Sequence, residues 1–173
     1  MMGSFMSKLS LMGLLLLFSF ICEAKPLVVE GDVEFVAIGR PDFITIDGVD
    51  GKLVDSKLVY DAGKITGEIS VDLTKMTTDM DLRDEHMKER YLVTAKYPKA
   101  RLSKIVAVGG KFTGQLTIKD ETKPVSGKFK LTDKKLSAEF KIQLKDFKNV
   151  GVPSHAGITV ANEVEIKVNG TVK

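Results

Sequence analysis

The sequence is poor in residues that give covalent or metal-based stability. It holds one cysteine, Cys22, no tryptophan and two histidines among 173 residues. A single thiol cannot form an internal disulfide, so the folded chain must be stabilised by a hydrophobic core. His86 and His155 lie far apart among scattered carboxylates and lack the spacing of a zinc site. We expect no metal and no cofactor.

Motifs for catalysis and for nucleic-acid binding are also lacking. Ser154 directly precedes His155, but adjacency in sequence does not make a catalytic triad, and there is no Gly-x-Ser-x-Gly elbow. The net charge is +3, and the charged residues are spread along the chain without a long basic run. We therefore expect a protein that has no catalytic residues and does not bind nucleic acid.

A long apolar run occurs only near the N-terminus, from Leu9 to Ile21. It follows a charged start and precedes Cys22-Glu23-Ala24, which is the pattern of an export signal with a small-residue cleavage site. The run is shorter than the roughly 20 apolar residues that a membrane-spanning helix needs. We expect residues 1–24 to be a signal peptide and residues 25–173 to be a periplasmic or secreted protein without a transmembrane segment. A lipoprotein anchored through Cys22 is the alternative.

Most of the remaining sequence alternates between apolar and polar residues, as strands with one buried face do. The alternation is clearest over residues 33–37, 65–73, 112–118, 136–144 and 164–172. Further strands are predicted over residues 43–46, 53–60, 100–108 and 124–131. Turn-forming residues separate these segments at 39–42, 61–63, 108–110, 119–121 and 132–134. A turn about every ten residues predicts an antiparallel meander.

The number of predicted strands constrains how they assemble. Eight or nine strands are too many for one exposed sheet unless the sheet curls, closes or splits. Closure into a barrel removes the sheet edges, and a barrel of about eight strands is wide enough to hold one small ligand. We predict one all-β domain that forms an antiparallel eight-stranded barrel. A two-sheet sandwich is the alternative.

Residues 79–92 interrupt the alternation and predict a short helical insertion. Thr77, Thr78 and Asp79 carry side chains that commonly cap the start of a helix. Tyr97-Pro98 then returns the chain to strand, because proline disfavours helical conformation in the residue before it. This polar, helix-like segment lies between strands with apolar faces, so we expect a binding site there.

Two motifs of this segment resemble those of a known family. Residues 83–87 read Arg-Asp-Glu-His-Met, and Lys96-Tyr97-Pro98 follows about ten residues later. Together they resemble the YceI-like family of exported polyisoprenoid-binding proteins, which have a lipocalin-like barrel. The similarity covers residues 25–173 through strand motifs at 33–35, 46–48, 65–69 and 160–166. It departs from the family pattern at Arg90-Tyr91-Leu92, where an aromatic pair and an aspartate are usual, and at Asp50, where an aromatic is common.

The resemblance implies a barrel that shields an apolar ligand, and such pockets have mostly apolar walls. The inward-facing strand positions and the apolar faces of the helix give the expected wall: Phe35, Ile65, Ile69, Leu82, Met87, Tyr91, Phe112, Leu116, Phe129, Phe140 and Ile142. The alternative is that these side chains fill a dry core.

Two polar residues of the helix are candidates for a ligand head group. Arg83 offers a planar fork for a group such as a diphosphate, and His86 can donate a hydrogen bond to a quinone or amide oxygen. Structural roles are the alternative for both. Arg83 would then pair with Asp84 or Asp79 and pin the helix to the barrel, and His86 would be a satisfied core residue.

The resemblance implies an exported carrier that sequesters an amphiphilic isoprenoid or isoprenoid-quinone-like lipid and performs no chemistry. Whether the chain forms a homodimer is left open. One rival is an envelope stress-response or protein-interaction module with a solid barrel core, whose surface binds another protein. A second rival is an enzyme, or an electron-transfer accessory that handles a quinone.

Overall fold

The computed structural model describes residues 24–41 and 44–173. Residues 1–23 carry nearly all of the expected signal peptide, including Cys22, and lie outside the described part, as do residues 42 and 43. No helix within the described residues is both long enough and apolar enough to cross a membrane.

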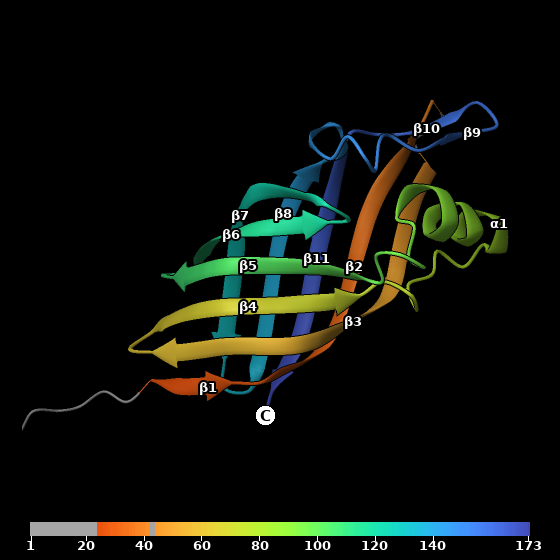
Figure 1. Cartoon of the computed structure of the whole chain (residues 1–173). Helices are drawn as coiled ribbons and strands as arrows, with labels where there is room; N and C mark the ends of the chain where they lie inside the picture. The colour runs from red at the N-terminus through yellow and green to blue at the C-terminus, as the bar shows by residue number, and fades with distance from the viewer. Residues whose placement is uncertain (1–23, 42–43) are drawn as a thin grey trace, which may run out of the picture.

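Eight antiparallel strands form a closed barrel (Figure 1). Each strand pairs with its neighbours in the sheet, and β2 pairs with both β3 and β11, which closes the circle. The predicted eight-stranded antiparallel barrel is therefore confirmed. The barrel strands are β2 (Val29–Arg40), β3 (Ile44–Asp61), β4 (Lys64–Asp72), β5 (Lys99–Val108), β6 (Lys111–Ile118), β7 (Glu121–Thr132), β8 (Lys135–Gln143) and β11 (Glu163–Val172).

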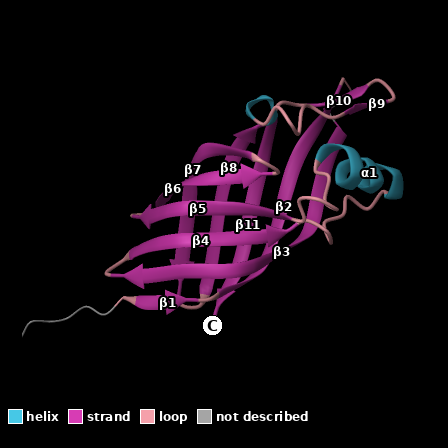
Figure 2. Ribbon diagram, in the orientation of Figure 1, coloured by secondary structure: helices cyan, strands magenta, loops and turns pink. Residues whose placement is uncertain are grey.

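Short helical turns and strands lie outside the eight barrel strands (Figure 2). The helical insertion between β4 and β5 has an α-helical turn, α1 (Asp81–Glu85), which continues as a π-helix, η1 (His86–Tyr91). It confirms the insertion predicted for residues 79–92. The remaining elements are β1 (Lys25–Leu27), the 3-10 turn η2 (Leu144–Asp146), β9 (Ser154–His155) and β10 (Ile158–Val160). The β9–β10 hairpin extends the sheet from β2.

Residues 43–46 and 53–60 do not form two separate strands, as the sequence predicted. From Ile44 onward they belong to the single long strand β3, whereas residue 43 lies outside the described part. The strand bends without ending. Asp50 has a φ of 63°, and the pairing with β2 shifts register between Val33 and Phe35. Gly48 makes room at this bend, because a Cβ there would lie 1.9 Å from Cε1 of Phe35.

The other strand and turn predictions agree with the structure. Residues 100–108 lie in β5 and residues 124–131 lie in β7. The turn signals at 61–63, 108–110, 119–121 and 132–134 lie where one strand ends and the next begins. At the first predicted turn, β2 ends at Arg40, and residue 42 is outside the described part.

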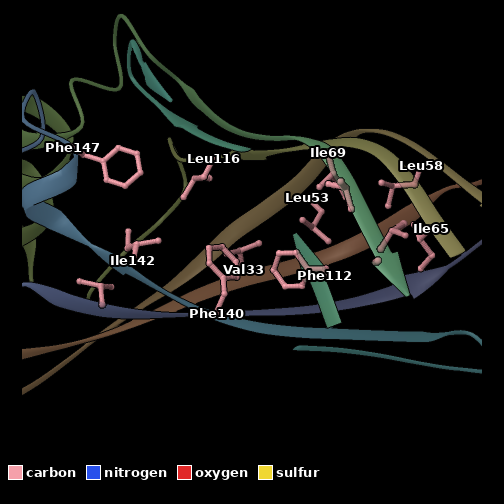
Figure 3. Packing of buried hydrophobic residues seen from close by; sticks show 14 of the residues in the cluster. Val33, Leu53, Leu58, Ile65, Ile69, Phe112, Leu116, Phe140, Ile142 and Phe147 are labelled. Carbon is pink, nitrogen blue, oxygen red and sulfur yellow. The ribbon is translucent and has the colours of Figure 1, made fainter. Parts of the chain in front are cut away.

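The inward faces of the strands form one large apolar cluster (Figure 3). Val33 and Leu53 come from the first half of the barrel, and Phe112 and Phe140 come from the second. The two phenyl rings meet edge to face, with their centroids 5.6 Å apart. Apolar burial stabilises a fold by about 25 cal/mol per Å². This burial is the main source of stability in a chain that cannot form an internal disulfide.

Candidate functional site

A cavity of about 480 Å³ lies inside the barrel. Its volume falls within the range of roughly 300 to 1,000 Å³ that is usual for ligand pockets. Most of its lining side chains are apolar. Among the described residues, the polar lining groups come from the helical segment and its approach and from β9, namely Thr78, Arg83, His86, Tyr91, Ser154 and His155. The cavity therefore has an apolar body and one polar end.

All the predicted site residues line this cavity. Those on strands are Phe35, Ile65, Ile69, Phe112, Leu116, Phe129, Phe140 and Ile142, and those on the helical segment are Leu82, Arg83, His86, Met87 and Tyr91. Leu82 differs from the rest of the apolar set because it is 51% exposed, which places it at the mouth of the cavity. Contact of these residues with a ligand stays a prediction.

Sequence reasoning missed part of the wall. Leu136 and Val164 line the cavity and continue the alternation of their strands, so the period-two pattern could have identified them. Ser154, His155 and Ile158 also line it, but they come from the short β9–β10 hairpin. Strands of two and three residues are too short to show a period, so no alternation marked them as part of the wall.

Asp84 holds the helical insertion against the segment before it. Its carboxylate accepts hydrogen bonds from the hydroxyl of Thr77, and from the backbone N–H and the hydroxyl of Thr78 at 2.7 and 2.6 Å. Burial opposes ionisation of Asp84, but these hydrogen bonds outweigh it and lower the pKa of the carboxyl group. The predicted capping was wrong in direction, because Met80 precedes the helix without a side-chain cap and the helix itself supplies the acceptor.

Arg83 is also bound to Thr78. Its Nε donates to the Thr78 hydroxyl at 2.9 Å, and its Nη2 donates to the Thr78 carbonyl at 3.1 Å. The partners expected from the sequence, Asp84 and Asp79, were wrong, because the Asp84 carboxylate is already engaged by two hydroxyls and an amide. The guanidinium thus pins the helix, and a role in head-group binding stays a prediction.

His86 is the polar side chain placed best for contact with a ligand. It is only 8% exposed and lines the cavity. Its ring packs edge to face against His155, with centroids 4.8 Å apart and planes 69° apart. Within the described residues its ring nitrogens have no hydrogen-bond partner, and no fully enclosed side-chain nitrogen or oxygen is left unsatisfied. The His86 nitrogens are therefore not fully enclosed by protein atoms.

Tyr91 connects the helix to the β9–β10 hairpin at the mouth. Its hydroxyl accepts a hydrogen bond from the Ser154 N–H at 3.1 Å and donates to the Ser154 carbonyl at 3.3 Å. On the other side, Nζ of Lys119 donates to the Tyr91 carbonyl at 3.2 Å. Two segments that are 63 residues apart in sequence are thereby held together over one end of the cavity.

Residues that could hold a metal ion do not cluster in the described part of the chain. No group of three or more His, Cys, Asp or Glu side chains is arranged for a metal ion there. His86 and His155 meet, but as a pair of rings packed edge to face, without a carboxylate among the described residues to complete a ligand set.

The fold and the cavity define a class: closed antiparallel β-barrels with a hollow apolar interior and a helical insertion at the mouth. The chain belongs to the YceI-like family, because the model of the YceI-like domain matches residues 32–172. The family expected from the Arg-Asp-Glu-His-Met and Lys-Tyr-Pro motifs is thus confirmed.

Two of the solved structures that are similar to this chain have a TM-score above 0.5. The crystal structure of Burkholderia cenocepacia BcnA has 20% sequence identity and a TM-score of 0.60, with 83% of this chain and 96% of that chain covered. A polyisoprenoid-binding domain from Saccharophagus degradans, implicated in plant cell wall breakdown, has 13% identity and a TM-score of 0.51, with 85% and 98% covered. At these identities the likeness shows a shared fold. No curated protein sequence matches the chain.

Proposed function

We propose that this protein is an exported carrier that binds one amphiphilic isoprenoid or isoprenoid-quinone-like lipid inside its barrel. The observation that carries this proposal is the division of the cavity into an apolar body and one polar end. A long apolar chain would be shielded from water by the strands, and its head group would lie beside the helical segment.

The apolar body of the cavity suits the chain of such a lipid. Transfer of apolar surface out of water is favourable by about 25 cal/mol per Å², whatever the detailed shape of the chain. The Saccharophagus degradans domain with the same fold is described as polyisoprenoid-binding, which supports this class of ligand. Membership of the YceI-like family supports it as well.

The polar end suits a head group that accepts or donates one hydrogen bond. His86 lines the cavity, is nearly buried and has no hydrogen-bond partner among the described residues. A neutral imidazole offers one donor and one acceptor, so it can bind a quinone oxygen, an amide or a hydroxyl. Arg83 contributes less, because Thr78 already engages its guanidinium.

Export is the second part of the proposal. The apolar run from Leu9 to Ile21 and the small-residue site near Ala24 support a signal peptide and a periplasmic or secreted location. A barrel that carries a water-insoluble lipid is useful in an aqueous compartment between or outside membranes. The carrier performs no chemistry in this proposal.

The interaction-module rival requires a barrel that is filled with side chains. A cavity of about 480 Å³ speaks against a filled interior and favours a carrier. The enzyme rival requires reacting groups in position. Within the described residues the cavity offers the imidazoles of His86 and His155, neither of which has a hydrogen-bond partner, and no group of metal ligands.

Native mass spectrometry tests the proposal directly. The protein is purified from its expressing cells without detergent, weighed in its native state, extracted with organic solvent and weighed again. We expect one additional mass per chain that is lost on extraction and identified as an isoprenoid lipid. A ligand-free chain that also takes up no added isoprenoid alcohol or quinone would contradict the proposal and favour the interaction module.

A further inference from the structure

Three large apolar side chains at the mouth of the cavity are open to solvent. Ile44 is 43% exposed, Met80 is 55% exposed and Leu82 is 51% exposed. All three also line the cavity. Ile44 begins β3, whereas Met80 and Leu82 lie at the start of α1, so two segments far apart in sequence contribute to one rim. We call these three residues the apolar rim.

The apolar rim differs from the other exposed apolar positions of the described chain. The large apolar side chains exposed elsewhere are Val28, Val59, Tyr60, Val106 and Val108, and none of these lines the cavity. Among the exposed large apolar side chains of the described residues, those of the rim are the ones that continue into the cavity wall. An apolar molecule that passes over the rim would enter the barrel along an unbroken apolar path.

Two carboxylates alternate with the rim residues. The sequence reads Asp79-Met80-Asp81-Leu82, and both aspartates are exposed. Neither side chain forms an ion pair or a hydrogen bond with another described residue, in contrast to the deeper Asp84. Apolar side chains flanked by unpaired carboxylates are complementary to a surface that offers apolar depth below a layer of ammonium groups.

We propose that the apolar rim docks on a phospholipid bilayer whose head groups carry ammonium ions, such as phosphatidylethanolamine. Met80, Leu82 and Ile44 would enter the boundary of the acyl chains, and Asp79 and Asp81 would remain among the ammonium groups. Docking places the mouth against the bilayer, so a lipid moves between membrane and barrel without crossing water. This inference rests on the proposed carrier function and adds the partner from which the carrier loads.

A single tryptophan at the rim reports docking, because the chain has no tryptophan of its own. In the full chain, Leu82→Trp is mixed with vesicles of phosphatidylethanolamine and phosphatidylcholine, part of which carry brominated acyl chains. We expect a blue shift and quenching of the emission. The matched control is Val108→Trp, at a position that is 55% exposed and does not line the cavity, and we expect neither change there.

Several outcomes would overturn the docking. These are an unchanged emission of Leu82→Trp, equal quenching at both positions, or quenching at Val108→Trp alone, which would mean that another face meets the vesicle. A blue shift of Leu82→Trp that grows with protein concentration in the absence of vesicles would assign the rim to a second copy of the chain.

A transfer measurement separates the docking from the carrier function. The double variant Met80→Gln/Leu82→Gln should load an isoprenoid alcohol from vesicles about tenfold more slowly or worse, because apolar contact with the bilayer is lost. Because both side chains also line the cavity, its loading from a dispersion in dilute organic solvent should fall as well, but by a clearly smaller factor than its loading from vesicles. Equal vesicle loading by both proteins, or an equal loss from both sources, would overturn the docking. A wild-type chain that loads from neither source would overturn the carrier function instead.

Discussion

The carboxylate of Asp84 accepts two hydrogen bonds from Thr78, one from its backbone N–H at 2.7 Å and one from its hydroxyl at 2.6 Å. The same hydroxyl accepts the Nε–H of Arg83 at 2.9 Å. Thr78 therefore joins Arg83 and Asp84 of the helix to the segment that leads into it. Because Thr78 is buried, water cannot readily replace these bonds.

We predict that Asp84→Asn destabilises the protein by about 1.5 to 3 kcal/mol at neutral pH, since hydrogen bonds to a charged group are replaced by weaker ones. The pKa of Asp84 is lowered in the folded state, so its contribution is complete above the ordinary carboxyl value of 3.8 and disappears as the pH falls below it. Urea unfolding of both proteins between pH 7 and pH 3 measures the difference.

The control for this prediction is Glu85→Gln, which removes an exposed carboxylate from the same helix where no hydrogen bond is formed. We expect the free energy of unfolding to change by no more than about 0.5 kcal/mol, as is usual for surface substitutions. A difference between wild type and Asp84→Asn that persists unchanged at pH 3 would contradict the role of the ionised carboxylate.

Ala107→Phe should fill the cavity. Ala107 is buried and lines the cavity. It pairs with Ile65 of β4 on one side and with Phe112 of β6 on the other. A phenyl group here occupies space that a ligand would need, so we expect lipid binding to weaken at least about tenfold while the stability of the ligand-free barrel holds or rises by about 0.5 to 2 kcal/mol. Binding is followed by native mass spectrometry and stability by thermal unfolding.

Val59→Phe is the matched control for cavity filling, because Val59 is exposed and does not line the cavity. It should bind lipid as the wild type does. Undiminished binding by Ala107→Phe would mean that the ligand lies elsewhere.

His86→Phe tests the polar end of the cavity. The substitution keeps a planar apolar ring but removes both nitrogens, and none of them bonds to another described residue. We expect a ligand with a hydroxyl or quinone head to bind about three- to tenfold more weakly, which corresponds to one net hydrogen bond of about 0.5 to 1.5 kcal/mol. A pure isoprenoid hydrocarbon should bind equally to both proteins in a competition assay.

His155→Phe serves as the comparison, because His155 also lines the polar end of the cavity but is exposed to solvent. It should lose less affinity for the head-group ligand than His86→Phe does. If His86→Phe binds both ligands as well as the wild type does, the head group has no contact with His86.

Tyr91→Phe should loosen the β9–β10 hairpin, because it removes the hydroxyl that bridges the N–H and the carbonyl of Ser154. We expect faster hydrogen exchange over residues 154–160 and a loss of stability of about 1 kcal/mol. Exchange mass spectrometry compares the variant with Tyr60→Phe, whose hydroxyl forms no hydrogen bond with the described residues. Equal rates of hydrogen exchange over residues 154–160 in both variants would contradict a stabilising role of the hydrogen bonds between Tyr91 and Ser154.

Most of the fold could be predicted because its signals are local. Alternation revealed the inward faces of the strands, and turn residues marked most of the places where one strand gives way to the next. The sequence predicted two strands in place of β3, at 43–46 and 53–60, with Gly48, Asp50 and Gly51 between them. In the structure they bend a strand whose pairing with β2 and β4 continues on both sides.

The contacts of the helical segment could not be predicted in the same way. The sequence motif pointed to Arg83 and Asp84. Their common hydrogen-bond partner is Thr78, whose position depends on how the chain turns before α1. The contact of His86 with His155 and that of Tyr91 with Ser154 join residues more than sixty positions apart. No period or motif encodes such distances.

The sequence by itself determined the barrel, the place of the helical insertion and the apolar inward face, because side-chain alternation and turn chemistry act over a few residues. Only the tertiary structure decided that the interior holds a cavity, since the curvature of the closed sheet fixes how far opposite walls stand apart. The tertiary structure also decided which apolar side chains are exposed at the mouth. It left His86 without a hydrogen-bond partner among the described residues. Both features depend on where the helical insertion and the β9–β10 hairpin lie on the barrel.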